Sequence, residues 1–539
     1  MEFGFWNLLN IMYLDPQTVR DGFIDSADVC LIGSGAGGSV LAKNLVEAGL
    51  SVIVLEEGGN FSSKDFNQRE ADMMPMLYQE AGGRATKDLS ITVLHAKCVG
   101  GTTVVNNCIC FRTPEDVLGH WHREFGVNQI DARSLEPHFE RVEKAMSVSP
   151  IQDYEINDNN RKLLRGAEKL GWRHGVIHHN RVNCSQCGCC MLGCPFDAKR
   201  NSMTVWIPQA SALGARIYPQ FRVERIRAAG MGRGRVSSVT GTVVENPRLP
   251  QSMSPSVYLE GSDARGVEPP RRFTIHAKLF ILAGGAVNSP QLLLNSRVAN
   301  SNGQVGKNLA LHPLFAAFGL FEEELKSYRG IPQSIYVDQF RDEGFVLEGI
   351  FAHPTVAAAS MASFGVNHQS LMRQYSHYAA AYTQVKDGSN GQVTVDRWGH
   401  VVLDYKISDN DLQAGLKGLG RIAEAFFAAG AKSVMTTHNP SLILQNADEV
   451  KKILNTPTRG NDLALFSAHP QGSCRMAADP ARGVVDSFCR SHDLQNLFIC
   501  DASVFPTSIG VNPMITIMAL ADRCAAYIIE NKQKLLNAP

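Results

Sequence analysis

The chain has 539 residues, and its 52 basic and 52 acidic residues give a formal net charge of zero. A chain of this length exceeds what one hydrophobic core usually covers, so two or more lobes are expected. No long run of either charge is present, which argues against nucleic-acid binding and against attraction to an anionic membrane by bulk charge.

Residues 1–26 form an apolar N-terminal extension with no basic residue before Arg20. A secretory signal peptide begins with a positively charged segment, so the cytoplasm is the default expectation, while export with a partner subunit would leave no mark in this chain. Residues 1–15 either pack on the protein itself or contact a membrane surface or a partner subunit. No uninterrupted apolar run approaches the roughly 18–20 residues that span a bilayer.

Residues 27–56 alternate between element types: a buried strand at 28–32, a glycine-rich turn, a helix of small residues, and a second strand at 51–55. This order predicts a βαβ unit. Bare backbone at the turn can approach a pyrophosphate, and the helix N-terminus favours its charge. Glu56, at the end of the second strand, is placed to accept hydrogen bonds from ribose hydroxyls. The glycines of the turn are Gly33, Gly35 and Gly38.

A second glycine-rich stretch, VGGTTVVNN at residues 99–107, has no βαβ unit of its own. It therefore indicates a loop draped over the same cofactor rather than a second nucleotide site. Its candidate contact residues are Gly101, Thr102 and Asn106.

The sequence CSQCGCCMLGCP at residues 184–195 has the CxxCxxCxxxCP spacing of a bacterial ferredoxin cluster, with Cys189 as a spare. Closely spaced thiolates can converge on one metal centre, so an iron-sulfur cluster is the first hypothesis. A zinc knot and a disulfide staple are the alternatives. The predicted ligands are Cys184, Cys187, Cys190 and Cys194.

The remaining patterns describe two kinds of sheet. Residues 216–226 and 278–283 are expected to be further strands of the nucleotide-binding sheet, with a helix at 289–295 after the second. Short alternating segments between residues 311 and 407 favour an antiparallel sheet that carries the substrate. Helices are predicted at 409–430 and 513–529, and a buried strand at 496–501.

Several motifs in one order resemble the glucose-methanol-choline (GMC) family of flavin oxidoreductases. They are GSGAGG with Glu56, GGTTVVNN, GGAVNSPQLL at 284–293, VGKNLALHP at 305–313, SAHPQGSCRM at 467–476 and CDASVFPTSIGVNPMITIMAL at 500–520. The resemblance implies FAD, with Asn106 beside the isoalloxazine ring, Val223 near the adenine and Asp501 on the ribityl chain. It also implies that the closing segment with Asn512, Pro513 and Met514 covers the flavin.

The expected fold is α/β with α+β lobes: a Rossmann-like FAD-binding domain built from discontinuous segments, and an antiparallel-sheet substrate domain. The predicted limits are 27–130, 207–310 and 460–539 for the FAD-binding domain, 131–206 for the cysteine-rich insert, and 311–459 for the substrate domain.

Oxidising an alcohol requires a base for the hydroxyl proton while hydride leaves for flavin N5, and a histidine suits that task near neutral pH. The resemblance places His469 and Asn512 at the flavin, His469 as the base and Asn512 as the group that orients the alcohol. The alternatives are a satisfied interior histidine and a helix N-cap ahead of Pro513.

Members of the family differ in where the electrons go after the flavin. Sugar dehydrogenases of the family carry a cluster at a CxxxxxCxxxCP pattern that Cys184, Cys190 and Cys194 match, so a 3Fe-4S or 4Fe-4S cluster passing electrons to a small protein, quinone or cytochrome subunit is expected here. Long-chain alcohol oxidases of the family carry a similar cysteine stretch without an implied cluster, so an oxygen-reducing long-chain alcohol or sterol-type oxidase is the alternative. The segment after GGTTVVNN resembles the long-chain-alcohol branch, which favours an apolar alcohol. A flavin-bound electron carrier without a substrate is a third hypothesis, and His469 with Asn512 argues against it.

Overall fold

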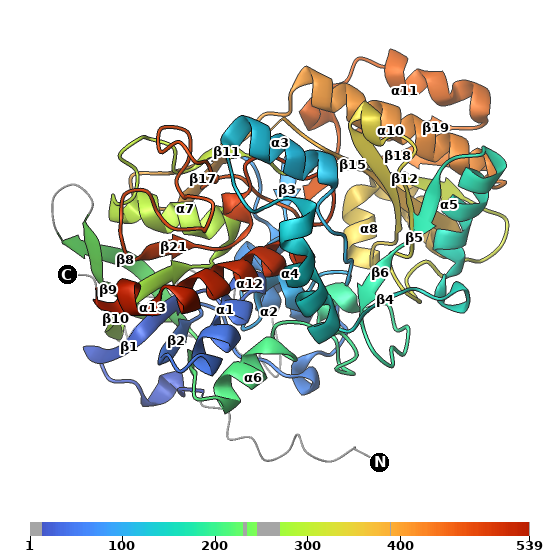
Figure 1. The fold of residues 1–539 in the computed structure, drawn as a ribbon. Helices are drawn as coiled ribbons and strands as arrows, with labels where there is room; N and C mark the ends of the chain where they lie inside the picture. The colour runs from blue at the N-terminus through green and yellow to red at the C-terminus, as the bar shows by residue number, and fades with distance from the viewer. Residues whose placement is uncertain (1–12, 230–233, 245–269, 389, 538–539) are drawn as a thin grey trace.

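The computed structural model describes residues 13–229, 234–244, 270–388 and 390–537 (Figure 1). Residues 1–12 lie outside this part of the chain, so the predicted contact through residues 1–15 stays a prediction. Within the described ranges, every helix is too short or too polar to cross a membrane.

The predicted βαβ unit is confirmed. Strand β1 (Phe23–Ile32) leads through the glycine turn into helix α1 (Ala36–Glu47) and on to β2 (Val52–Leu55). The two strands are parallel, and all four residues of β2 are buried. Because parallel strands are covered on both faces, this continuous apolar run is the expected pattern.

The βαβ unit belongs to a seven-stranded sheet that distant parts of the chain complete. Its order is β7, β2, β1, β10, β9 and β8, and β21 pairs with β10. The strands β7, β2, β1, β10 and β21 run parallel, while β9 and β8 form an antiparallel extension. The added strands are β7 (Arg216–Tyr218), β8 (Phe221–Ala229), β9 (Arg235–Val243), β10 (Arg272–Leu282) and β21 (Leu497–Ile499).

The prediction of one strand over residues 216–226 is wrong. The chain breaks into β7 and β8, which occupy opposite edges of the sheet. Gln220 between them takes a positive φ of 64°, in the left-handed region that turns the chain. The other predicted strands and helices of this sheet are confirmed, with α7 spanning Gly285–Ser296.

Helices cover both faces of the seven-stranded sheet. Helix α1 packs against α12 (Met514–Glu530) and α6 (Trp206–Ala212), and α12 packs against α4 (Ala132–Ala145) (Figure 1). Helix α7 packs instead against β8. The return of α12 onto α1 brings a C-terminal helix against the helix of the βαβ unit.

The predicted antiparallel sheet is also confirmed, with nine strands. Seven follow the order β19, β18, β12, β15, β14, β13 and β5, while β20 pairs with β12 and β3 pairs with β20. Helices α10 (Asp409–Ala428) and α5 (Asp158–Lys169) pack on one face. Gly415 and Gly418 of α10 let it approach closely, since a Cβ there would lie 2.2 Å from Phe315 and 2.3 Å from Thr383. The strands are β3 (Ile91–Val93), β5 (His174–Val176), β12 (Leu314–Leu320), β13 (Ile335–Val337), β14 (Phe345–Ile350), β15 (Tyr378–Val385), β18 (Ser433–Thr436), β19 (Ile443–Leu444) and β20 (Leu465–Ser467).

One part of the region predicted to be antiparallel, strands β16 and β17, lies outside the nine-stranded sheet and forms a separate small sheet with β11. Both lobes consist of several segments of the chain, because β3, β5 and β20 join the nine-stranded sheet from outside residues 311–459. The exact domain limits stay a prediction. The bounds of the small sheet and of the remaining helices are β11 (Lys307–Leu309), β16 (Gly391–Val395), β17 (Val401–Asp404), α2 (Glu70–Leu77), α3 (Glu115–Phe125), α8 (Pro354–Ser360), α9 (Gly365–Arg373), α11 (Lys451–Asn455) and α13 (Lys532–Asn537).

Candidate active site

A cavity of about 1070 Å³ joins the carboxyl ends of the parallel strands to the free face of the antiparallel sheet. Ligands of open α/β sheets bind at the carboxyl ends of the strands. The volume exceeds the roughly 300–1,000 Å³ of an ordinary small-molecule pocket, so it has room for a dinucleotide together with a substrate.

The glycine turn forms one end of this cavity. Gly33 takes a φ of +105°, and a Cβ there would lie 2.3 Å from the Ala283 carbonyl oxygen. A Cβ on Gly38 would lie 2.0 Å from the Gly33 carbonyl oxygen, so Gly38 serves the packing of helix on strand and does not line the cavity. Gly35 does line it, and its nearest neighbour for a Cβ is Gly101 at 3.8 Å. This leaves bare backbone at the N-terminus of α1 facing the cavity, which fits a pyrophosphate.

Glu56 lines the cavity and ties its two glycine loops together. Its carboxylate accepts hydrogen bonds from the Ser34 hydroxyl at 2.7 Å and from the Gly58 backbone N–H at 2.9 Å. The Ser34 oxygen in turn accepts from the Gly100 N–H at 2.9 Å. Burial raises the pKa of Glu56 to about 7, and these hydrogen bonds oppose the rise. The ribose contact predicted for Glu56 stays a prediction.

The other predicted cofactor residues line the same cavity: Gly101, Thr102, Asn106, Val223, Asp501, Asn512, Pro513 and Met514. Two of them meet directly, since the Asn106 Nδ2 group lies 2.9 Å from the Met514 sulfur. Asp501 accepts hydrogen bonds from the Ser289 hydroxyl at 2.6 Å and the Gly285 N–H at 2.9 Å, and burial raises its pKa. Asp501 therefore fixes the start of α7 against the end of β21.

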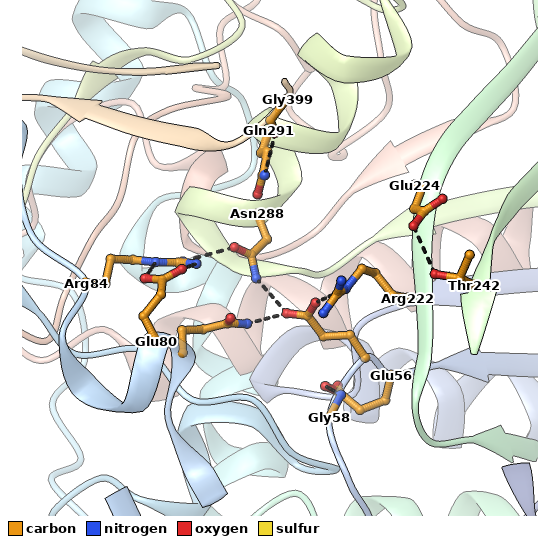
Figure 2. A network of polar contacts seen from close by, with 12 residues as sticks. Glu56, Gly58, Glu80, Arg84, Arg222, Glu224, Thr242, Asn288, Gln291 and Gly399 are labelled. Atoms are coloured by element: carbon orange, nitrogen blue, oxygen red, sulfur yellow. Dashed lines mark hydrogen bonds and ion pairs between the residues drawn. The ribbon is translucent and has the colours of Figure 1, made fainter. Parts of the chain in front are cut away.

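A polar network in the same cavity was not predicted from the sequence. Arg222 pairs with Glu57 at 3.5 Å, and the Asn288 amide connects Glu57 to Arg84 (Figure 2). Arg84, which is 6% exposed, also makes a two-armed ion pair with Glu80 at 2.7 Å. Apart from Glu80 and Arg84, these residues come from distant segments, so the fold brings them together beside Val223.

His469 and Asn512 meet in the cavity from different segments. His469 follows β20, Asn512 precedes α12, and His469 Nε2 lies 3.4 Å from Asn512 Nδ2. Burial lowers the pKa of His469 to about 4, so its imidazole is neutral at pH 7 and able to accept a proton. The His469 Nδ1 and Asn512 Oδ1 atoms are buried without a hydrogen-bond partner, which leaves both side chains with bonding capacity for a ligand.

The helix-capping alternative for Asn512 does not match the geometry. The N-cap position of α12 is Pro513, and no side chain makes a capping hydrogen bond there. His312 packs against the His469–Asn512 pair, and its ring lies 5.5 Å from the ring of His469 in an edge-to-face arrangement.

Two stretches of the chain, residues 74–314 and 387–521, match the N- and C-terminal patterns of the GMC oxidoreductase family. Together they cover well over half of the sequence. The chain belongs to the GMC oxidoreductase family.

Relatives of this GMC oxidoreductase include an uncharacterized GMC-type oxidoreductase of Mycobacterium tuberculosis, 31% identical over 92% of this chain and 75% of the relative. Long-chain-alcohol oxidase FAO3 of Arabidopsis thaliana is 29% identical over 94% of this chain and 68% of its own length. Among solved structures, formate oxidase of Aspergillus oryzae superposes with a TM-score of 0.68 at 14% identity, covering 96% of this chain and 100% of that one. Pyridoxine 4-oxidase of Mesorbium loti gives a TM-score of 0.64 at 17% identity, covering 93% and 98%. The structural likenesses confirm the predicted fold.

The family supports FAD as the cofactor of this GMC oxidoreductase, and the cavity fits it. The fit rests on the exposed backbone of Gly35, the orphaned polar atoms of His469 and Asn512, and the volume of the cavity. Membership of the GMC family also confirms that the protein is an oxidoreductase, and it is consistent with the oxidation of an alcohol.

The predicted metal cluster is not supported. Within the described ranges, the one group of three or more potential metal ligands whose atoms lie within 4.8 Å of one another is Cys489, Cys500 and Cys524, on other segments. The predicted ligands Cys184, Cys187, Cys190 and Cys194 do not form such a group, and membership of the family does not imply iron.

The cysteine loop of this GMC oxidoreductase is folded around other contacts. The Cys189 thiol lies within hydrogen-bonding distance of the Cys187 carbonyl at 3.7 Å and of the Gln68 side-chain oxygen at 3.4 Å. Gly188 and Gly193 take positive φ values of 85° and 84°, which turns the backbone twice within six residues. The loop is then fastened by the buried Lys199 ammonium, which donates at 2.6–2.7 Å to the carbonyls of Val104, Asn106 and Cys190. Lys199 thus holds the cysteine loop against the 99–107 stretch.

Proposed function

We propose that this protein oxidises an apolar alcohol to the corresponding carbonyl compound with FAD as cofactor, His469 as the base, and oxygen as the final electron acceptor. The observation that carries the proposal is the pairing of His469 with Asn512 in one cavity. The glycine turn lies at one end of this cavity, and an apolar face of the antiparallel sheet lies at the other.

The chemistry divides between cofactor and chain. When bound, FAD supplies the acceptor for the hydride that leaves the carbinol carbon. The neutral His469 imidazole takes the hydroxyl proton, which it can do because burial keeps it unprotonated at neutral pH. Asn512 Nδ2 donates a hydrogen bond to the substrate oxygen without competing for its proton, and so orients the alcohol.

The face of the antiparallel sheet opposite the glycine turn determines the substrate class. Leu314, Ala316 and Phe318 alternate along β12 and point into the cavity, while the residues between them pack under α10. Ala380 of β15 and Ile350 of β14 extend the same apolar surface. An alkyl chain gains free energy on leaving water for such a surface, whereas a sugar would leave its hydroxyls without partners.

A series of straight primary alcohols tests the substrate class. Each methylene buried contributes about 0.8 kcal/mol, so kcat/KM is expected to rise roughly fourfold per carbon until the cavity is filled. The measurement is peroxide formation against substrate concentration, with glucose as the polar comparison. A flat series, or a preference for glucose, contradicts an apolar substrate.

A triple variant, C184S/C187S/C194S, tests the electron route. These three thiols are partly exposed, so the substitutions leave the core in place. We expect no iron or acid-labile sulfide in the parent, one peroxide formed per alcohol oxidised, and unchanged turnover with oxygen in the variant. Stoichiometric iron in the parent that disappears from the variant, together with slow turnover in oxygen, would restore the cluster hypothesis.

A further inference from the structure

Three buried cysteines from separate segments, here called the cysteine triad, meet at the end of strand β21. Cys489 lies in the loop before β21, Cys500 directly follows the strand, and Cys524 lies on α12. Their Sγ atoms all lie within 4.8 Å of one another, and each residue is at most 1% exposed. Metal–sulfur bonds of about 2.3 Å place the sulfur atoms around one ion about 4 Å apart. The three thiols are therefore close enough to share one ion.

Backbone contacts hold two members of the triad in place. Cys489 takes a φ of 67°, in the left-handed region, and its carbonyl accepts the Ile499 N–H at 2.9 Å. The Cys500 N–H donates to the Leu282 carbonyl at 2.7 Å, which continues the pairing of β21 with β10. A residue other than glycine seldom takes a positive φ, so tertiary contacts fix this conformation of Cys489. The positions of Cys489 and Cys500 thus follow from the backbone of β21 and the loop before it.

A buried cation accompanies the triad. Arg523 precedes Cys524 on α12 and is 5% exposed. Its guanidinium lies 4.4 Å from the centre of the Phe488 ring, and it donates to the backbone carbonyls of Ser487 at 2.5 Å and Asn128 at 3.1 Å. Arg523 therefore lies between the helix that carries Cys524 and the loop that carries the first cysteine of the triad.

Within the described ranges, no carboxylate forms an ion pair with Arg523. The nearby Asp486 pairs instead with Arg490 at 3.2 Å. Burial lowers the pKa of Arg523, and negative charge on the triad opposes this change. A buried charge without a partner is costly in free energy. Thiolates bound to a metal ion stay ionised when they are buried, so a loaded triad would supply the missing negative charge.

We propose that the cysteine triad binds one Cu(I) ion. Thiolates are soft ligands that favour Cu(I), zinc and iron–sulfur clusters. Structural zinc takes four ligands, but within the described ranges no fourth cysteine, histidine or carboxylate joins the triad, and its burial excludes water. Cu(I) accepts the lower coordination number that three thiolates provide. The thiolates outweigh the charge of a monovalent ion, and the guanidinium of Arg523 offsets the excess.

The ion joins separate parts of the seven-stranded sheet and its cover. It links α12, which packs on α1 of the βαβ unit, to β21 and to the loop before it. Asp501, which follows Cys500, holds the start of α7 and lines the cavity. Because the thiols meet only when these segments pack, the ion binds as the chain folds. The site depends neither on the alcohol nor on the electron acceptor of the proposed function.

The test measures copper by elemental mass spectrometry in protein made by cells grown with added copper. The protein carries the C184S/C187S/C194S substitutions, because these partly exposed thiols otherwise compete for copper. We expect about one copper ion per chain after dialysis. The copper X-ray absorption spectrum should show sulfur neighbours alone, at the distance of about 2.3 Å that is usual for metal–thiolate bonds.

Cys489→Ala and Cys524→Ala, made in the same protein, each remove one ligand. Bound copper should fall by about tenfold or more, since even the loss of a group that only supports a metal ligand has an effect of this size. Cys30→Ala is the matched control, because Cys30 of β1 is as deeply buried but lies outside the triad. It should retain the copper of the parent. Thermal unfolding and FAD content identify a variant that does not fold, and the sulfur neighbours in the parent spectrum then decide.

A parent without copper overturns the proposal, and reduced thiols in such a protein would mean that the three cysteines only pack together. Copper that remains in both Cys489→Ala and Cys524→Ala also overturns it, because the ion then lies elsewhere. Nitrogen or oxygen neighbours in the parent spectrum, or zinc in place of copper, contradict a Cu(I) site made of these three thiolates.

Discussion

His469→Gln is expected to lower kcat for alcohol oxidation by about 10²–10⁴-fold while FAD remains bound. The imidazole is the one neutral base placed next to Asn512 in the described part of the cavity, and glutamine fills its volume without accepting a proton at neutral pH. The measurement is the rate of substrate-dependent peroxide formation, with FAD content checked by absorbance of the purified protein.

His438→Gln provides the control for this substitution. His438 is also a buried histidine, hydrogen-bonded at 2.6 Å to the Thr436 hydroxyl, but it lies outside the cavity. Replacing His438 should change the free energy of unfolding alone and leave kcat per bound FAD unchanged. Equal losses in both variants would mean that His469 is a structural histidine.

The pH dependence adds a second check on His469. Burial lowers its pKa to about 4, so the base is available above that pH and is lost as the pH falls through it. The kcat/KM of the parent should therefore hold down to about pH 5 and decline below, and the decline should be absent from the residual activity of His469→Gln.

The sequence predicted those parts of the fold and the site whose residues are adjacent in the chain or belong to one motif. The βαβ unit follows from the periodicity of residues 27–56, because each element there is adjacent in the chain. His469 and Asn512 were found because each stands in an ordered family motif. The hydrogen bonds of the buried Glu348 to Gln333 and Tyr382 were missed, since these residues belong to different strands of the antiparallel sheet and the loop before β13. The one available signal was an acidic residue within the apolar run 345–351.

The wrong strand prediction and the cluster prediction, which is not supported, have a common physical reason. A cysteine spacing is compatible with a metal site, but it does not decide where the thiols point; the left-handed turns at Gly188 and Gly193 and the Lys199 ammonium decide that here. The break between β7 and β8 likewise depends on the left-handed Gln220, a residue type that gives little warning of such a turn. Backbone conformations outside the common regions are set by tertiary contacts, which a pattern of residue types does not contain.

Gly37→Ala and Gly35→Ala should separate folding from FAD binding, although the two glycines are two residues apart. A Cβ on Gly37 would lie 2.0 Å from the Cys500 carbonyl oxygen, where α1 meets the end of β21. This contact is with backbone and cannot relax cheaply, so the free energy of unfolding is expected to fall by about 3 kcal/mol or more. Gly35 has a φ of −70° and meets only Gly101 at 3.8 Å, so alanine there should change the stability of the apoprotein by less than about 0.5 kcal/mol.

The difference appears when FAD is added. A ligand that binds only the folded state raises the unfolding temperature by an amount that grows with the logarithm of its concentration over Kd, so the parent should be stabilised by FAD. Gly35→Ala should lose most of this stabilisation, because its methyl group projects into the cavity at the N-terminus of α1, where bare backbone would receive the pyrophosphate. If Gly35→Ala instead binds FAD as tightly as the parent does, the pyrophosphate lies elsewhere in the cavity. If Gly37→Ala folds with parental stability, the approach of α1 to Cys500 is not the tight contact that the geometry indicates. The two variants thus test whether the glycines of one motif serve the ligand and the fold separately.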